Sequence, residues 1–460
     1  MRLAFKAALM AMLTLAILIP LQMIRGTIHE RQQYREAAVR EIGASFGGRQ
    51  VLAGPVLVVP YEERVVETEG DENGARKTVR RKSGQWTFFP DTLAIDGTLK
   101  PDVRRRGLHQ VRVYEWDGQA VARFDVQLPS EEGNVQRTIG QPWLSLGIAD
   151  VGGMRGAPQL TVNGVAVKVE QGIGHADGPG VHARLAVPAA GARLRLDARA
   201  ALQLRGTETF AMVPLGANND LRLQSSWPHP KFDGKSPQQD IDARGFHARW
   251  QIAAVGSNAQ RRYLQTPVLA PGQQLAESAE QALERGMPWA APGDAVSVSL
   301  IDPVNPYLQA DRATKYGLLF VLLTFVGFFM FELIKQVRVH PIQYLLVGMA
   351  IAIFFLLLVS LSEHIAFGLS YLLAALACIG LIGVYLAAVL RSTARGLGFA
   401  AMLGTLYAAL YGLLLSEDNA LALGAGLLFV ILAAIMLITR KVDWYQVAMH
   451  QPGAADGARS

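Results

Sequence analysis

The apolar residues of this chain are gathered into separate runs, and this segregation constrains the fold more than any other feature. From Tyr316 onward the sequence contains successive apolar runs, each of about 20 residues, the length that a helix needs to cross a bilayer. Between Arg25 and Thr314 no such run occurs. The sequence therefore predicts a chain that is part soluble domain and part membrane domain.

The first apolar run extends from Leu3 to Ile24 and opens with two basic residues, Arg2 and Lys6. A cleaved signal peptide is one interpretation of such a segment. The run continues past Pro20, however, and no small-x-small cleavage site follows it. We therefore predict an uncleaved signal anchor, which stays in the membrane as the first span.

The predicted later spans alternate with loops of different charge. These spans cover residues 316–334, 342–361, 367–390, 396–415 and 420–438. Three connections carry pairs of basic residues, namely Lys335 and Arg338, Arg391 and Arg395, and Arg440 and Lys441, whereas the loops 362–364 and 416–419 contain no Lys or Arg. Because short basic loops stay in the cytoplasm, we predict a multi-pass bacterial inner-membrane protein with six spans, cytoplasmic termini and a large periplasmic domain.

Some basic residues contradict this orientation, because they flank spans on the predicted outer side: Arg25, Arg31, Arg35, Arg312 and Lys315. A long translocated domain is largely exempt from the charge rule, so the three basic pairs decide the prediction. The predicted domains are an anchor helix at 1–24, a periplasmic β-rich domain at 25–314, a five-span bundle at 315–441 and a cytoplasmic tail at 442–460.

The large domain shows the two-residue periodicity of strands after a helical continuation of the first span at 27–42. Leu221 and Leu223, for example, flank Arg222, and such alternation indicates strands with one buried face. Dipeptides that tolerate positive φ predict hairpin turns: Asp96-Gly97, Asp117-Gly118 and Asn163-Gly164. The predicted fold is therefore an α-helical transmembrane bundle plus a large all-β, sandwich-like domain.

One hairpin is predicted in more detail, in residues 61–86, where Asn73-Gly74 separates an acidic half from a basic half. A two-residue type I′ turn at this pair is the expected connection. It would bring opposite charges together across the strands: Asp71 with Arg76, and Glu67 with Arg80. A disordered, solvated insert is the alternative interpretation.

The net charge of +6 does not indicate a nucleic-acid partner, because it is spread as +2 over residues 1–24, +2 over 25–314 and +2 over 315–460. No basic face results, and topology accounts for the excess beside the spans. The single cysteine, Cys378, lies inside an apolar run. The soluble domain is therefore predicted to contain no disulfide.

Motifs with a catalytic or cofactor-binding mechanism are scarce. Gly43-Ala44-Ser45-Phe46-Gly47 matches the G-x-S-x-G nucleophile elbow, but an elbow needs a strand before the serine and a helix after it, and the predicted order is the reverse. The histidines show no metal-ligand spacing, and no phosphate-binding glycine motif occurs. We predict no enzyme activity, no catalytic residue, no cofactor and no metal site.

A carrier is the main alternative to a structural role. Ion-coupled carriers usually place ionisable residues within the bilayer. The only Asp, Glu, Lys, Arg or His residues in the predicted spans are Lys6 and Glu332. Both lie near span ends and are expected to reach water. This distribution weakens the carrier hypothesis without excluding it.

Two groups of residues in the bundle are candidate contact sites. Small residues recur at every fourth position of the fifth span and predict close helix packing, within the bundle or against a partner: Gly396, Ala400, Gly404, Ala408 and Gly412. We expect Gly404→Leu to disrupt folding of the bundle or its assembly. Polar residues of the two outer loops form a candidate patch, although solvated loops carry charges without a function: Glu363, His364, Glu417 and Asp418.

A series of motifs follows one order along the chain: Gly54-Pro55, residues 56–61 (Val-Leu-Val-Val-Pro-Tyr), Ser226-Trp227-Pro228-His229-Pro230, residues 245–250 (Gly-Phe-His-Ala-Arg-Trp), Asp302-Pro303-Val304, Phe331-Glu332-Leu333, His340-Pro341-Ile342-Gln343-Tyr344, Ser362-Glu363-His364, Glu417-Asp418 and residues 439–445 (Thr-Arg-Lys-Val-Asp-Trp-Tyr). Together they resemble the CreD family of inner-membrane proteins of Gram-negative bacteria, over essentially the whole chain. One departure is Asn419, where the family pattern leads us to expect an aromatic residue. The Trp227 motif itself is either a ligand-facing loop or a packed corner between strands.

The resemblance implies a cell envelope integrity protein, linked to a two-component regulatory system and to tolerance of colicins and β-lactams. It implies no reaction and no catalytic residues. Two hypotheses follow. In the first, a non-enzymatic protein anchored in the lipid bilayer uses its β-rich domain to contact envelope proteins or a glycan or lipid ligand. In the second, the five-span bundle acts as a carrier or handles lipid.

Overall fold

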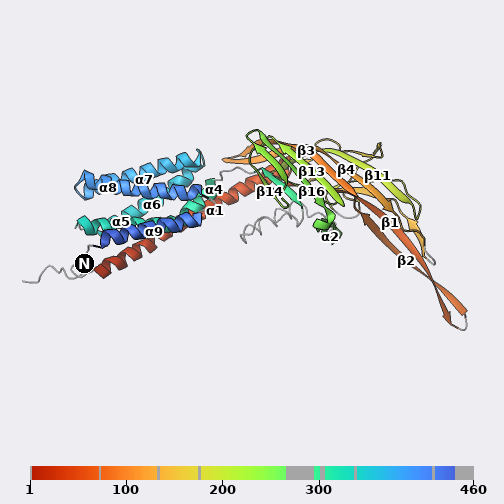
Figure 1. Ribbon diagram of the computed structural model, residues 1–460, viewed down its shortest axis with the longest axis horizontal. Coiled ribbons are helices and arrows are strands. Elements are labelled where there is room, and N and C mark those ends of the chain that lie inside the picture. Colours follow the sequence, from red (N-terminus) through yellow and green to blue (C-terminus); the bar gives the residue numbers. More distant parts are fainter. Residues whose placement is uncertain are drawn as a thin grey trace, which may run out of the picture. The chain divides into compact units, whose positions relative to one another are not determined.

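The computed structural model describes residues 3–71, 74–131, 135–174, 178–265, 295–300, 306–335, 339–416 and 420–440 (Figure 1). The chain forms two compact units: Met1–Tyr34 together with Val304–Ser460, and Arg35–Pro303. We call the first the helical unit and the second the β-rich unit. The predicted tail at 442–460 and the acidic pair Glu417 and Asp418 lie outside the described residues.

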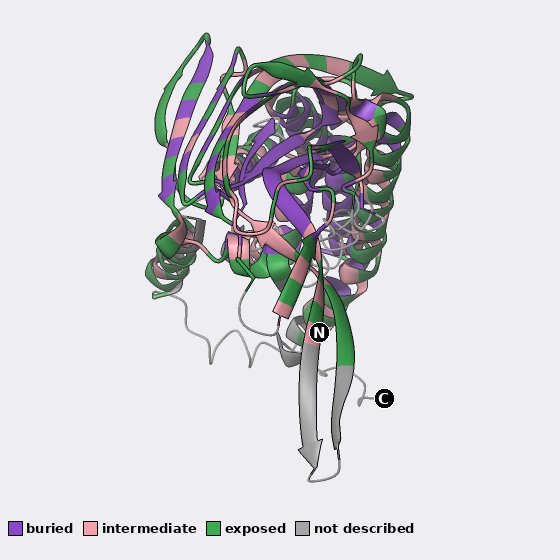
Figure 2. Ribbon diagram, turned by 90° about the vertical axis from the view of Figure 1, so that its right-hand side faces the viewer, coloured by how far each residue is buried: buried purple, intermediate pink, exposed green. Residues whose placement is uncertain are grey.

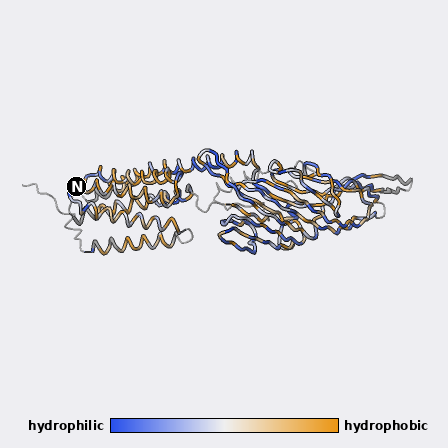
Figure 3. The backbone as a smooth tube through the Cα atoms, turned by 90° about the horizontal axis from the view of Figure 1, so that it is seen from above, coloured by the Kyte–Doolittle hydropathy of each residue, from blue (hydrophilic) through white to orange (hydrophobic). Residues whose placement is uncertain are grey.

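The helical unit contains apolar helices (Figure 3), and their residue bounds are similar to those of the predicted spans. Their bounds are α1 Leu3–Phe46, α4 Pro306–Lys315, α5 Gly317–Lys335, α6 Pro341–Ser362, α7 Phe367–Val389, α8 Thr393–Leu415 and α9 Ala420–Thr439. Among the described residues, four helices (α1, α6, α7 and α8) are long and apolar enough to cross a membrane. The pair α4 and α5, bent by 45°, makes a fifth if it counts as one span, and α9 holds a shorter apolar stretch at 422–433.

The interior of the helical unit is filled by apolar and aromatic side chains. The ring centroid of Tyr407 in α8 lies 4.5 Å from that of Phe320 in α5 and 4.7 Å from that of Phe354 in α6. One face of α1 joins the same core, at spacings of three or four residues that share a helix face: Leu13, Ile17, Leu21, Ile24 and Ile28. The first span is therefore packed into the helical core as an integral member.

The β-rich unit is built from two sheets and begins with the last part of α1. The strands of the first sheet are β1 Gln50–Asp71, β2 Gly74–Phe88, β5 Val135–Ile139, β6 Trp143–Ile148, β9 Glu170–Gln171, β10 Gly180–Arg184, β12 Thr209–Val213, β14 Pro230–Asp233 and β17 Val296–Leu300. Across the described residues its order is β14-β17-β12-β1-β6-β10-β9, with β2 and β5 also paired to β1.

The second sheet has an outer face rich in polar side chains. Its strands are β3 Thr92–Arg106, β4 His109–Gln127, β7 Gln159–Val162, β8 Val165–Val167, β11 Arg193–Thr207, β13 Asn218–Ser225, β15 Gln238–Asp242 and β16 Gly245–Ala253. Within the described part of the chain they follow the order β15-β16-β13-β3-β4-β11-β7-β8. Short helices lie at η1 Val151–Gly153, η2 Ala254–Gly256 and α2 Ala259–Gln265.

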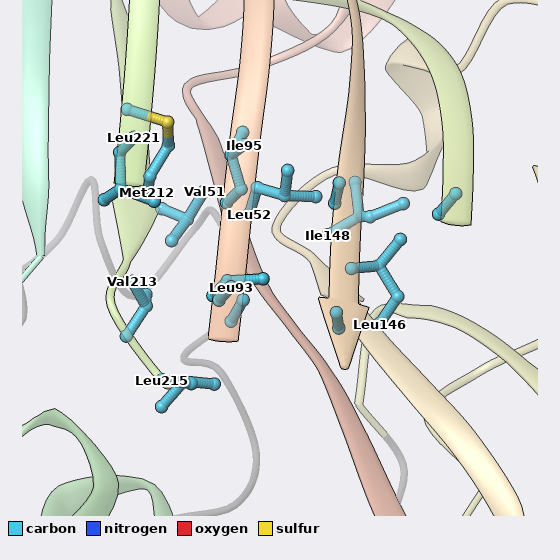
Figure 4. Packing of buried hydrophobic residues seen from close by; sticks show 14 of the residues in the cluster. Val51, Leu52, Leu93, Ile95, Leu146, Ile148, Met212, Val213, Leu215 and Leu221 are labelled. Atoms are coloured by element: carbon cyan, nitrogen blue, oxygen red, sulfur yellow. The ribbon is translucent and has the colours of Figure 1, made fainter. Parts of the chain in front are cut away.

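The two sheets share one apolar core (Figures 2 and 4). Leu52 and Met212 of the first sheet and Ile95 and Leu221 of the second are fully buried in the same cluster. In β13 the buried Leu221 and Leu223 alternate with the exposed Arg222, which confirms the predicted periodicity. The expectation of a β-rich domain built from packed sheets is therefore confirmed.

Two of the three predicted hairpin turns are wrong. Asp96-Gly97 and Asp117-Gly118 lie inside β3 and β4, where the two glycines are opposite each other. Their role is in packing, because a Cβ at either glycine would overlap the indole ring of Trp116. Asn163-Gly164 is a turn as predicted: it joins β7 to β8 with φ values of 52° and 81°.

The hairpin predicted in residues 61–86 is confirmed, but its predicted register is wrong. β1 and β2 pair antiparallel with Asp71 opposite Gly74 and Glu67 opposite Thr78. The pairing is thus displaced by two residues from the prediction. The connection, 72–73, lies outside the described residues.

The base of this hairpin shows how side chains pack in the observed register. Tyr61 lies opposite Gly84, and its ring stacks on Trp86 at 4.0 Å between centroids. Only a glycine at position 84 leaves room for this ring, since a Cβ there would lie 2.6 Å from the Tyr61 hydroxyl. An even shift keeps every side chain on the same face, so alternation alone could not distinguish the two registers.

Candidate functional site

The predicted polar patch is represented in the structure by Glu363 and His364, which follow α6. His364 is exposed, but only 9 % of the Glu363 side chain is exposed. Glu363 accepts a hydrogen bond of 3.3 Å from the hydroxyl of Tyr307 in α4, and it lies 3.4 Å from Nε of Arg31 in α1. The structure therefore links Glu363 with two residues that sequence analysis did not select as a site.

A second ion-paired group lies in the same unit. Asp311 of α4 is buried; its carboxylate lies 2.8 Å from Nζ of Lys315 and 3.9 Å from Nε of Arg25. In the β-rich unit, Arg35 pairs with Glu208 at 3.0 Å. A carboxylate removed from water needs a compensating cation. Basic residues that contradicted the predicted orientation thus have a structural reason for their position.

The small-residue stripe of α8 begins with a close contact to α7. Gly396 is buried, and a Cβ built on it would lie 2.6 Å from Cβ of Ala387. Ala400 follows this contact, with its Cβ 3.2 Å from the position of a Cβ on Gly383. These two positions let α7 and α8 approach each other closely.

The rest of the stripe has no comparable neighbour. Apart from the neighbouring backbone of α8 itself, no described atom lies within 4 Å of a Cβ built on Gly404 or Gly412, and Ala408 is exposed. Packing within the bundle therefore involves the first part of the stripe, and a partner helix at the remaining positions stays a prediction.

The start of α6 is organised by the His340-Pro341 motif. The ring of His340 accepts a hydrogen bond from the backbone N–H of Ile342, and the side chain of Gln343 accepts one from the backbone N–H of His340. This capping box, with Pro341 at the first helical position, satisfies donors that the first turn leaves free.

Glu332, near the end of α5, is buried, so the expectation that it reaches water is wrong. It is 6 % exposed and accepts hydrogen bonds from the Tyr344 hydroxyl at 3.0 Å and from the backbone N–H of Val339 at 3.4 Å. A cavity of about 20 Å³ lies beside it and is otherwise lined mainly by apolar side chains. Such a volume accommodates about one water molecule.

Comparison with protein families matches residues 2–445 to the family described as "Inner membrane protein CreD". The chain belongs to the CreD family. One curated relative, the inner membrane protein CreD of Escherichia coli (strain K12), is 35 % identical over 440 residues, which are 95 % of this chain and 92 % of the relative. The sequence resemblance is confirmed, and the chain is a multi-pass inner-membrane protein with a β-rich domain.

The motifs of this CreD-family chain include the buried Glu332 and the ion-paired Glu363. Polar groups deeper in the bundle are also satisfied internally. The Tyr371 hydroxyl donates to the backbone carbonyl of Tyr407 at 2.7 Å, and the Tyr407 hydroxyl contacts Sγ of Cys378 at 3.0 Å. These contacts join α7 to α8, so the polar groups serve helix packing.

In the β-rich unit the Trp227 motif is a packed corner. The Arg112 guanidinium lies over the Trp227 ring at 4.0 Å, and the Trp227 indole N–H donates to the His229 carbonyl at 3.0 Å. Ser45 of the G-x-S-x-G match lies in the last turn of α1, before β1, so the elbow geometry is not present. No group of three or more potential metal ligands occurs among the described residues.

Sequence reasoning missed Arg31, Tyr307 and Tyr344 as members of polar networks. One signal was available for Arg31, since it is a cation on the side of the membrane where the charge rule does not expect one. For the tyrosines the signal was weaker, because tyrosine is common at membrane interfaces. Their partners lie on other helices, and only the packed bundle brings them together.

Proposed function

We propose that this CreD-family protein supports cell envelope integrity without enzymatic activity, through contacts that its β-rich domain makes with envelope proteins or with a glycan or lipid ligand. In this proposal the chain crosses the inner membrane six times, both termini are cytoplasmic and the β-rich domain is periplasmic. Family membership and the alternation of basic and non-basic loops support it.

The observation that carries the proposal is the filled interior of the bundle. Fully buried rings occupy its centre, including Phe325, Phe354, Phe355 and Phe399. The buried hydroxyls of Tyr344 and Tyr371 bond to neighbouring helices. A carrier needs a polar path that alternately opens to the two sides of the membrane. A bundle packed in this way is suited to anchoring a soluble domain.

A carrier or lipid-handling function is the second candidate, and Glu332 favours it. A buried carboxylate within a span is by default a candidate functional group, because burying charge is costly. In the first function Glu332 joins α5 to the start of α6 through Tyr344. In the second it binds a proton or a cationic group of the substrate.

The orientation is tested with topology reporters. Fusions after Glu363 and after Ser416 should report a periplasmic location, and a fusion after Arg395 a cytoplasmic one. A cytoplasmic signal from the Ser416 fusion would overturn the topology, and with it the placement of the β-rich domain.

The choice between the two functions is tested in cells that lack their own copy of the protein. We expect Glu332→Gln to restore β-lactam and colicin tolerance as well as the unchanged chain, because the amide keeps the shape of the carboxylate. Loss of tolerance at normal protein level would favour the carrier. Crosslinking in intact cells would then identify the partners of the β-rich domain.

A further inference from the structure

A shallow groove of about 410 Å³ lies on the outer face of the second sheet. It crosses β15, β16, β13 and β3, and its volume falls within the range of about 300–1,000 Å³ that is typical of small-molecule sites. Its lining includes Gln239 of β15 and six further polar residues: Asp96, Arg222, Gln224, Gln238, Asp240 and His247. We call these six residues the polar groove.

Strand pairing places the polar groove in two rows on one face of the sheet. In one row, Asp240, His247 and Gln224 lie opposite one another on β15, β16 and β13. In the other, Arg222 of β13 lies opposite Asp96 of β3. Neighbouring strands are about 4.8 Å apart, so hydrogen-bonding groups recur at that interval across the sheet.

Two members of the polar groove already have partners in the protein, since Arg222 pairs with Asp220 at 2.5 Å and the Gln224 amide donates to the Thr98 hydroxyl at 2.7 Å. Three other members differ from the rest of this sheet face. Elsewhere arginines hold the carboxylates: Asp125 pairs with Arg193 at 2.5 Å, and Glu115 with Arg205 at 3.1 Å. Within the described part of the chain, the side chains of Gln238, Asp240 and His247 make no hydrogen bond to protein groups. Their donors and acceptors face water and are available to a ligand.

The chemistry of these side chains selects a class of ligand. Amides and imidazole each offer a donor and an acceptor, carboxylates accept and guanidinium donates. A hydroxyl both donates and accepts, so a ligand rich in hydroxyls can bond to every member of the polar groove. Two carboxylates beside one guanidinium disfavour a polyanion, and the apolar lining residues, Leu223 and Ala248, are buried in the core, which disfavours a lipid tail.

We propose that the polar groove binds an uncharged, hydroxyl-rich glycan of the cell envelope, lying across β15, β16, β13 and β3. This inference rests on the proposed function, because it takes the β-rich domain to be periplasmic. It commits the domain to one of the ligand classes that the proposed function leaves open.

The test measures binding of N-acetylglucosamine oligosaccharides to the full-length protein in lipid nanodiscs, since many detergents are themselves glycosides. Titration calorimetry should show saturable binding. We expect the double variant Gln224→Ala/His247→Ala to bind at least about tenfold more weakly, since each lost hydrogen bond contributes about 1 kcal/mol. Gln203→Ala is the matched control, because Gln203 is an exposed amide on β11 of the same sheet and outside the polar groove.

Three results would overturn the inference: no saturable binding to the unchanged protein, equal binding by the double variant, or equal loss of binding in Gln203→Ala. These are distinct from failure of the proposed function. A periplasmic β-rich domain without oligosaccharide binding removes the glycan site and leaves the proposed function in place. If the domain binds oligosaccharide but the topology reporters place it in the cytoplasm, the binding site remains and the proposed function is removed.

Discussion

The helical unit and the β-rich unit place their polar groups in opposite ways. In the helical unit the acidic side chains Glu332 and Glu363 lie at or beside helix ends, and large apolar side chains are exposed along α7 and α8. In the β-rich unit the apolar residues form the core between two sheets, and arginine–carboxylate pairs cover the outer face of the second sheet.

This difference follows from the surroundings that each unit is built for. Lipid offers no hydrogen bonds, so a polar group within the bundle must find its partner within the protein, and the hydroxyls of Tyr344 and Tyr371 find theirs on another helix. Water competes for each surface ion pair, so a pair on an exposed sheet face contributes only about 0–1 kcal/mol. Polar residues therefore hold helices together in the helical unit, whereas on the outer face of the β-rich unit they contribute little to stability.

The largest effect is expected where two helix backbones touch. Gly396→Leu should prevent α7 and α8 from packing, because even a Cβ would lie 2.6 Å from Ala387. We expect its level in the membrane to fall severalfold. Gly404→Leu is the matched substitution on the same helix, where a Cβ meets no described atom within 4 Å apart from the neighbouring backbone of α8 itself.

Immunoblots of membrane fractions and thermal unfolding of the purified variants measure both effects. Normal accumulation of Gly396→Leu would show that α7 and α8 separate without harm. Disruption by Gly404→Leu, as the sequence alone predicted, would instead show that a partner helix covers the second half of the stripe. Either outcome would contradict the interpretation that α8 packs only through the first part of its stripe and within a single chain.

A smaller effect is expected in the β-rich core. Gly118→Ala forces a methyl group against the ring of Trp116 and to 2.5 Å from the carbonyl oxygen of Asp96, and overpacking of this kind costs about 1–3 kcal/mol. Gly164→Ala, in a turn with open space around it and a φ of 81°, should cost only about 1 kcal/mol.

Tryptophan fluorescence during denaturant unfolding distinguishes the two variants. The order of the two effects is the prediction: a larger loss of stability for Gly164→Ala would mean that Trp116 moves aside easily. In that case the two glycines of β3 and β4 would not be required by packing.

The smallest effect concerns pH and should appear in the β-rich unit alone. The Arg249 guanidinium, 2.7 Å from Asp220, holds the pKa of that carboxyl below its usual range. Arg193 and Arg199 lower the pKa values of Asp125 and Asp197 in the same way. A carboxyl with a lowered pKa in the folded state stabilises that state while it is ionised. This contribution is present above the unfolded pKa of about 3.9 and is lost as the pH falls through the folded value.

Circular dichroism between pH 7 and pH 2 should therefore show the strand signal weakening before the helix signal, with the loss beginning at about pH 4. Asp220→Asn, which removes one such carboxyl, should reduce the dependence on pH slightly. Simultaneous loss of both signals, unchanged in Asp220→Asn, would mean that these surface pairs do not determine the acid stability of the β-rich unit.

Much of the architecture was predictable because it depends on local patterns. The helices α5 to α9 begin and end within a few residues of the predicted spans, and the alternation in β13 gave its buried face. The hairpin of β1 and β2 was predicted from its Asn73-Gly74 pair, but its register differs by two residues, and alternation along the strands does not distinguish the two registers. The candidate site was less accessible, since Glu363 was chosen as a loop charge and is held by Arg31 and Tyr307.

The sequence by itself determined that this chain has membrane-spanning helices, a β-rich domain and the motifs of one family, because hydropathy and periodicity are properties of neighbouring residues. Only the tertiary structure decided that Glu332 is buried against Tyr344, that Gly97 and Gly118 make room for Trp116, and that cations near the spans are paired with carboxylates. The physical reason is the same in each case. Burial and pairing depend on residues that are distant in sequence, and only the packed fold brings those residues together.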